Sequence, residues 1–414
     1  MQQSAVSPQE KQIKQVEQTT CCVVGGGPAG AILALMLARQ GVSVTLLEAH
    51  LDFDRAFRGD VIYPSTLTIM EELGLLDSIL QICHAKRSDI VYEMGDTSMV
   101  IADLSLLKTK HPYIAMIDQA AFLNVVTKEA ARYPGFQLVM GARMEELLIE
   151  NGSVHGVRYR GQDGWVEVQA NLVVGCDGRF SRTRKLAGME AKKIFSSVDV
   201  LWFRLSRKPD DSTEGLLRIS SQRVLALLER PDHWQVGYVI PKGKYQEIRA
   251  ASLERFRESV VDACPMFADR IEELREWKQV SVLAVNSDCL PQWYQSGLLL
   301  IGDAAHVMSP VGGVGINCAI QDAVVAGNVL SEKLKEGTVQ KQDLAEVQRQ
   351  RGLPTKVLQK YQFFLQRRLL DKSINASKGF SVPPIIRFLF GVPFTRDFLV
   401  RMIVFGPRPV HVKG

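Results

Sequence analysis

Three glycines near the start of the chain have the spacing of a dinucleotide-binding turn. They follow a short apolar run, residues 19–24, in the pattern Gly25-x-Gly27-x-x-Gly30. The first glycine of such a pattern permits a tight turn, the second lets the backbone approach a pyrophosphate, and the third lets helix and strand pack closely. Because the next residues have a helical pattern, free N–H groups at the helix start favour an anion. A phosphate site is therefore predicted here.

An acidic residue completes this unit. Residues 42–48 form a β-branched, apolar strand that ends in Glu48, 18 residues after Gly30. A carboxylate at this place can accept hydrogen bonds from an adenosine ribose. The order strand, glycine turn, helix, strand predicts a Rossmann-type domain, but this motif alone does not distinguish FAD from NAD.

A second glycine-rich segment follows another short buried strand, residues 298–301. Asp303 is placed at the strand end, where ligand crevices form, and its carboxylate can accept a hydrogen bond from a ligand there. Pro310 has no N–H and gives a rigid wall for a flat ring, with Val311 expected beside the same ring.

The same segment then opens a helix, residues 315–336, whose dipole favours an anionic ring end. Its glycines let backbone donors come close to a ligand. The cofactor-binding residues predicted here are Gly313, Gly315, Ile316 and Asn317.

Three segments in order resemble the p-hydroxybenzoate hydroxylase-like (group A) FAD-dependent monooxygenases. They are the turn at residues 25–30, the run Gly-Cys-Asp-Gly-Arg-Phe-Ser-Arg-Thr-Arg at residues 175–184, and residues 299–323 with Gly-Asp-Ala-Ala-His and Gly-Gly-Val-Gly-Ile-Asn. The resemblance spans residues 19–340. It implies non-covalent FAD, NAD(P)H as a transient co-substrate, and hydroxylation of an aromatic or other electron-rich small molecule by dioxygen through a flavin hydroperoxide.

The resemblance also assigns roles to residues outside the glycine turns. Asp177 and Arg184 would hold the loop that serves FAD and NAD(P)H, although a plain turn and a solvated charge remain the alternatives. Arg58 would lie near the pyrophosphate, with Arg55 as a nearby competitor. Gln119 would contact the cofactor, or would simply begin a helix.

Other side chains invite a role that the pattern does not establish. His306 could be a base, but we expect a structural histidine satisfied by backbone groups. Trp202, Trp234 and Tyr238 could line a substrate cavity or belong to the core. Since the flavin carries the chemistry, we assign no catalytic acid or base.

Composition limits the remaining classes. The chain has 414 residues, 46% hydrophobic and 23% charged, with a net charge of +5 spread along it. This balance does not indicate nucleic-acid binding. Seven scattered cysteines without a CxxC pair indicate thiols in a reducing cytoplasm, with no disulfide framework and no metal site. We find no signal-peptide core and no membrane-length apolar run.

The fold class expected is α/β, with a Rossmann-type FAD domain interleaved with an antiparallel-sheet substrate domain. The FAD domain is expected at residues 19–87, 108–192 and 283–345, and the substrate domain at 88–107 and 193–282. Residues 1–18 are expected to be a disordered leader, and residues 346–414 a helical C-terminal segment.

Alternative functions stay open on the sequence alone. An isoprenoid-chain reductase or a halogenase of the same fold would use the same motifs. A non-catalytic redox sensor or membrane-docked flavoprotein is motivated by apolar stretches with basic insertions at residues 383–390 and 398–405. The same stretches could instead cover the cavity or form a homodimer contact.

Overall fold

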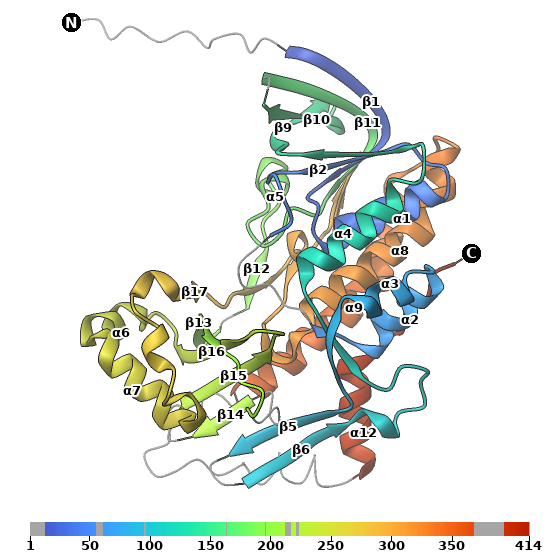
Figure 1. Cartoon of the computed structure of the whole chain (residues 1–414). Helices are drawn as coiled ribbons and strands as arrows, with labels where there is room; N and C mark the ends of the chain where they lie inside the picture. Colours follow the sequence, from blue (N-terminus) through green and yellow to red (C-terminus); the bar gives the residue numbers. More distant parts are fainter. Residues whose placement is uncertain are drawn as a thin grey trace, which may run out of the picture.

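The computed structural model describes residues 13–54, 61–94, 97–162, 164–194, 196–211, 217–220, 223–367 and 393–413. Two sheets dominate these residues, one at each end of the molecule, with long helices beside them (Figure 1). The α/β class with interleaved sheets is therefore observed, because both sheets draw strands from distant parts of the chain.

The larger sheet has eight strands in the order β19-β20-β11-β1-β2-β8, with β10 on β11 and β9 on β10. Neighbours from β20 to β8 are parallel, and β19, β10 and β9 add antiparallel partners. Its strands are β1 (Ile13–Val24), β2 (Val44–Glu48), β8 (Phe136–Met140), β9 (Arg143–Glu150), β10 (Ser153–Gly161), β11 (Gly164–Gly175), β19 (Tyr294–Gln295) and β20 (Leu298–Leu300).

The first strand begins earlier than predicted. β1 starts at Ile13, so residues 13–18 belong to a strand and not to a disordered leader. Their polar composition hid this, because most of these residues are exposed and only the later part of β1 is buried. The partner β11 supplies the backbone hydrogen bonds, pairing in parallel from Ile13 with Trp165 to Val24 with Gly175.

Four helices pack together beside this sheet. α1 (Pro28–Arg39) packs against α4 (Gln119–Ala130) and α8 (Gly315–Lys335), and α9 (Lys341–Leu365) packs on α8 (Figure 1). α1 is apolar on all sides and almost wholly buried, which explains its weak amphipathic pattern. α9 contains Pro354 in its interior.

The second sheet has seven strands in the order β17-β13-β16-β15-β14-β5-β6. All pairs are antiparallel except β14 with β5, which is parallel. The sheet is therefore mixed, whereas the sequence predicted a purely antiparallel one. The parallel pair arises where two separate chain segments meet. The strands are β5 (Asp89–Met94), β6 (Thr97–Asp103), β13 (Val198–Ser206), β14 (Leu217–Ser220), β15 (Arg223–Glu229), β16 (His233–Pro241) and β17 (Ser281–Leu283).

Helices cover the outer face of this second sheet. α6 (Tyr245–Ala251) and α7 (Leu253–Ala263) lie at its far side in Figure 1. Phe203 and Tyr238 from the sheet meet Phe256 of α7 edge to face, with ring centroids 5.6 and 5.3 Å apart. This apolar layer leaves the opposite face of the sheet to look toward the helices of the larger unit.

Smaller elements join the two units. Two three-stranded sheets have the orders β3-β7-β4 and β12-β18-β21. Their strands are β3 (Val61–Ile62), β4 (Cys83–Arg87), β7 (Ile114–Ile117), β12 (Lys192–Ile194), β18 (Ser287–Cys289) and β21 (His306–Val307). The remaining helices are α2 (Pro64–Glu72), α3 (Leu76–Gln81), α5 (Arg182–Leu186) and α12 (Pro393–Val404), with 3-10 turns at 104–106, 265–267, 271–273, 277–279, 302–304 and 311–313.

Within the described residues, one helical stretch, Val311–Lys335, is long and apolar enough to cross a membrane. In its apolar part 72% is buried inside the protein, as in a core helix. All seven cysteines are free thiols. Among the described residues no cluster of His, Cys, Asp or Glu could hold a metal ion.

Candidate functional site

The predicted ligand residues converge because four parallel strands end at the same edge. Val24 of β1 pairs with Leu47 of β2 and Gly175 of β11, and Gly175 pairs with Leu300 of β20. The residues that follow these ends are the first glycine turn, Glu48, the Asp177 loop and Asp303. The carboxyl edge of a parallel sheet is where α/β proteins bind their ligands.

A cavity of about 380 Å³ opens at this edge and extends to the inner face of the second sheet. It is lined on the larger unit by Gly27, Pro28, Ala29, Gln119, Cys176, Gly178, Arg179, Asp303 and residues 308–313, 315 and 316. Eight predicted site residues therefore share one cavity: Gly27, Gln119, Asp303, Pro310, Val311, Gly313, Gly315 and Ile316.

The three glycines of the first turn have different surroundings. A Cβ on Gly25 (φ +105°) would lie 2.6 Å from the Cys176 carbonyl oxygen, and a Cβ on Gly30 would clash with the Gly25 carbonyl oxygen. No atom lies within 4 Å of a Cβ on Gly27, which faces the cavity and precedes α1 without a side-chain cap. Gly25 and Gly30 thus permit the packing, while Gly27 leaves room for a ligand at the helix N-terminus.

Glu48 is buried behind this turn. Its Oε2 accepts a hydrogen bond from Gly26 N at 3.0 Å, and its Oε1 accepts one from His50 N at 2.9 Å. Each carboxylate oxygen can accept a further bond. The geometry therefore holds Glu48 rigidly at the strand end.

Asp177 is held by its own loop. Its carboxylate accepts hydrogen bonds from Ser181 Oγ at 2.5 Å and from Thr183 N and Oγ1 at 2.9 Å. Arg184 donates to the carbonyl oxygen of Arg179 at 3.0 Å. Cys176, Gly178 and Arg179 line the cavity, so Asp177 shapes the loop and its neighbours present the surface.

The second glycine segment bends sharply into the cavity. Gly312 and Gly313 have φ of +79° and +62°, which L side chains rarely adopt. The hydroxyl of Tyr63 donates to the Gly312 carbonyl oxygen. α8 then begins at Gly315 without a side-chain cap, so its first N–H groups have no side-chain acceptor in the described structure.

Asn317 is predicted to bind the cofactor, and its side chain makes hydrogen bonds within the protein. Its Oδ1 accepts from Tyr63 N at 2.9 Å and Thr66 Oγ1 at 2.7 Å, and its Nδ2 donates to Val61 O at 2.9 Å and Gly313 O at 3.3 Å. The whole amide is occupied. The side chain ties α8 to β3 and α2, behind the cavity wall.

His306 is structural, but its partner is a carboxylate and not the backbone. Its Nε2 lies 2.5 Å from Asp322 Oδ2, and Arg351 Nε donates to Asp322 Oδ1 at 2.7 Å. Burial by itself raises the pKa of Asp322, but the charges of His306 and Arg351 hold that pKa below its ordinary value. This ion cluster lies beneath Gly302, whose N–H also bonds Asp322.

The alternating register of the second sheet decides among the three aromatic candidates. Trp202, with Val200 and Val198 on the same side of β13, lines the cavity. Trp234 and Tyr238 point to the opposite face of β16 and pack in the core with α7. A Cβ on Gly237 would lie 2.8 Å from Cη2 of Trp202, so the missing side chain gives the indole its place.

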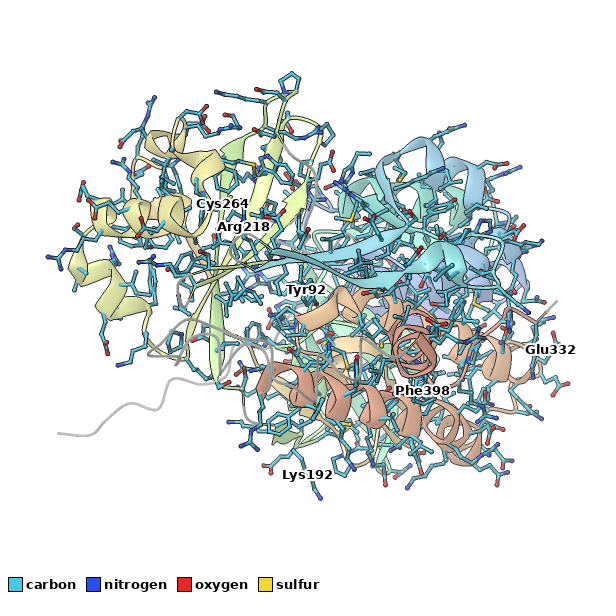
Figure 2. All side chains as sticks on the ribbon, turned by 90° about the horizontal axis from the view of Figure 1, so that it is seen from below. Tyr92, Lys192, Arg218, Cys264, Glu332 and Phe398 are labelled. Atoms are coloured by element: carbon cyan, nitrogen blue, oxygen red, sulfur yellow. The ribbon has the colours of Figure 1, made fainter. Side chains whose placement is uncertain are left out.

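Sequence reasoning missed several cavity residues. Tyr92 lies near the middle of the molecule in Figure 2 and lines the cavity, with Tyr63, Gln235 and Asn286. Burial raises the pKa of Tyr92 to about 12, so its hydroxyl stays protonated near neutral pH. For Gln235 the signal was present, since it alternates with Gly237 and Val239 along one strand face. Arg58 and its competitor Arg55 lie outside the described residues.

These features fit FAD. The open approach at Gly27, the uncapped starts of α1 and α8, and the carboxylates of Glu48 and Asp303 lie along one carboxyl edge. Residues 18–359 match the family described as "FAD binding domain". The chain belongs to this family of FAD-dependent monooxygenases.

Named relatives agree with the family. The 6-methylpretetramide 4-monooxygenase of Streptomyces rimosus is 34% identical over 400 residues, covering 96% of this chain and 94% of that protein. The para-nitrophenol 4-monooxygenase of a Pseudomonas strain is 26% identical over 329 residues, covering 76% and 78%.

Solved structures show the same fold. Anhydrotetracycline hydroxylase from Streptomyces rimosus superposes with a TM-score of 0.75 at 21% identity, covering 94% of this chain and 76% of that one. For p-nitrophenol 4-monooxygenase from Pseudomonas putida the TM-score is 0.74 at 21% identity, with coverage of 95% and 100%. A brominase, 16% identical, shares the fold alone.

The monooxygenase therefore uses FAD, NAD(P)H and dioxygen to hydroxylate an aromatic or other electron-rich small molecule. The reductase, halogenase and non-catalytic alternatives are not favoured by these relatives.

Proposed function

We propose that the monooxygenase binds FAD along the carboxyl edge of the large sheet and hydroxylates a flat, multi-ring aromatic compound held against the second sheet. Residues 19–87, 108–192 and 283–345 then form the cofactor domain, and residues 88–107 and 193–282 the substrate domain. The observation that carries this proposal is the single cavity shared by the glycine segments and the inner face of the second sheet.

The placement of FAD follows from the chemistry of each part of the edge. The adenosine ribose lies at Glu48, the pyrophosphate at the N-terminus of α1 beside Gly27, and the ribitol chain at Asp303. Pro310 and Val311 would face the flat ring, and the N–H groups of Gly313, Gly315 and Ile316 would hold its pyrimidine end. Gln119 and Arg58 are the remaining cofactor contacts, and Asp177 acts through its loop.

The substrate class follows from the opposite wall. The inner face of the second sheet contributes mostly apolar side chains with one indole, and few polar groups among them: Ile90, Tyr92, Val198, Val200, Trp202, Leu217, Ala226, Leu228, Gln235, Val239 and Leu283. Flat apolar walls with few polar groups bind aromatic rings. The names of two matched proteins, for 6-methylpretetramide and anhydrotetracycline, support a substrate of more than one ring.

The C-terminal helix closes the cavity in this proposal. Val400, Ile403 and Val404 of α12 line it, while Phe398 on the same helix is exposed (Figure 2). A helix that contributes cavity wall on its buried side serves as a cover, and this favours the covering role over docking on a membrane. Residues 383–390 lie outside the described part of the chain.

The protein's own contribution is binding, orientation and exclusion of water. Bound FAD supplies the oxygen-transfer chemistry. Among the described lining residues the ionisable side chains are Tyr63, Tyr92, Cys176, Arg179 and Asp303. Burial raises the pKa of Tyr63, Tyr92 and Cys176, so none of these three is an anionic base near neutral pH. A mostly apolar wall also excludes water from the place where the substrate would react.

The test compares a multi-ring with a single-ring compound. Protein carrying FAD is mixed with NAD(P)H, ¹⁸O-labelled dioxygen, and either 6-methylpretetramide or para-nitrophenol. We expect 6-methylpretetramide to accelerate flavin reduction and to gain one labelled oxygen, and acid precipitation to release the flavin. Preference for para-nitrophenol would contradict the multi-ring proposal, and product without the label would contradict oxygen transfer.

A further inference from the structure

The inner face of α9 carries a line of buried polar side chains. Arg351, Thr355, Gln359, Gln362 and Gln366 are each 3% exposed or less. Their spacing of three or four residues places them on one face of the helix. Burial of polar groups is costly unless they are paired, so the partners of this line indicate what it does.

The partners follow the second glycine segment along its length. Arg351 bonds Asp322, which accepts the Gly302 N–H. Eight residues further along the helix, about two turns, Gln359 Nε2 donates to the Val307 carbonyl oxygen at 3.0 Å. The helix therefore reaches Gly302 through Asp322, and it contacts residues 307–311 directly.

Gln362 makes the contact that lies nearest the proposed flavin ring. Its Nε2 donates to the carbonyl oxygens of Ser309 at 2.8 Å and Val311 at 2.6 Å. A primary amide has two N–H groups, and both are used, one on each side of Pro310. Pro310 has no N–H, so the peptide between Ser309 and Pro310 cannot be held in place by a hydrogen bond from the Pro310 nitrogen.

The side-chain oxygen of Gln362 makes no such contact. Its Oε1 is buried without a hydrogen-bond partner among the described residues. An unpartnered buried oxygen lowers stability, so this amide is kept in place at a cost to the fold. The family match ends at residue 359, just before this position.

We propose that Gln362 is a positioning residue for the flavin reaction, because its amide bridges the two carbonyl groups that flank Pro310 and holds the loop 308–313 in one arrangement against the ring. This inference rests on the proposed placement of FAD beside Pro310. The bridge restrains the loop from behind, so it leaves the cavity face clear for ring and substrate.

The experiment uses FAD-loaded protein and two variants, each of which replaces one buried glutamine by methionine. Gln362→Met keeps the length of the side chain and removes both donors. Gln366→Met is the matched control, because Gln366 is equally buried on the same helix but donates to the hydroxyls of Ser196 and Ser197 at 3.0 and 3.2 Å. Hydrogen–deuterium exchange of residues 308–313 and the absorbance and fluorescence of bound flavin are measured in both.

We expect Gln362→Met to exchange about tenfold faster in residues 308–313, because two hydrogen bonds that restrain the loop are lost. Its flavin spectrum should move toward that of free FAD, and peroxide formed per NAD(P)H oxidised should rise. Gln366→Met should match the wild type in the exchange of this loop and in the spectrum. If Gln362→Met fails to fold, Gln362→Glu, which has the same shape, is tested in its place.

The outcomes separate the bridge from the flavin placement. Unchanged exchange in Gln362→Met or Gln362→Glu, or equal changes in Gln366→Met, would overturn the bridge. Faster exchange with an unaltered flavin spectrum would also contradict the proposal, and would locate the error in the placement of FAD beside Pro310.

Discussion

The two walls of the cavity are built in different ways. The cofactor wall consists of turns at strand ends, where glycines and backbone groups face the ligand. The substrate wall is one face of a sheet, where every second side chain faces the ligand. On the cofactor wall, the position of a single Cβ decides whether a ligand fits. On the substrate wall, the register of each strand decides which side chains face the ligand.

The largest expected effect tests the cofactor wall. Gly30→Ala places a methyl group against the Gly25 carbonyl oxygen, 3.3 Å from Cys176 Cβ. We expect a loss of about 1–3 kcal/mol in the free energy of unfolding and purification without FAD. Gly27→Ala has open space around its Cβ, so its stability should stay within about 0.5 kcal/mol of wild type, with weaker FAD binding. Urea denaturation and FAD titration measure both, and a fully loaded, stable Gly30→Ala would refute this account of the turn.

Carboxylates on the same wall give the next effect. Asp303→Ala and Glu48→Gln each weaken a charge-assisted bond to the cofactor, at a cost of about 1.5–3 kcal/mol, or roughly ten- to a hundredfold in the FAD dissociation constant. Flavin fluorescence titration and retention after dialysis report this directly. Wild-type flavin occupancy in both variants would show that the cofactor lies elsewhere.

The substrate wall allows a comparison of two neighbouring positions of one strand, which face opposite sides of the sheet. Gly237→Ala adds a methyl group 2.8 Å from the Trp202 ring and should push the indole into the cavity. We expect KM for the aromatic substrate to rise about tenfold with FAD binding unchanged. Val236→Ala, on the opposite face in the core with α7, should cost about 1–3 kcal/mol of stability and leave KM alone. Similar KM values for the two variants would contradict the assigned faces.

The difference between the walls also explains what the sequence could reveal. The roles of Gly25, Gly27 and Gly30 depend on local spacing, which is visible in one strand–turn–helix unit. Trp202 and Trp234 could not be separated, because their directions depend on the pairing of β13 with β16. Side-chain partners distant in sequence were also invisible, as with Asn317 and Tyr63 or His306 and Asp322.

The smallest effect concerns acid stability beneath the cofactor wall. The pKa of Asp322 is lowered in the folded protein, so this carboxylate stabilises the fold above its unfolded pKa of about 3.9. That stabilisation is lost as the pH falls through the lower, folded pKa. Asp322→Asn removes this titration, so its stability should fall less steeply as the pH drops below about 4, by up to about 1.4 kcal/mol per pH unit. Denaturant titrations across this range measure the slopes, and parallel slopes would contradict the ion cluster.

The central claim is that one wall holds the cofactor and the other holds the substrate. Diffraction from crystals of the FAD-loaded protein tests it most directly. We predict density for the adenosine at Glu48, the pyrophosphate at the start of α1, and the ring between Pro310 and the inner face of the second sheet. The account would be contradicted if the adenosine of FAD lay against Trp202 and Val200 and no density lay at the glycine turn of residues 25–30.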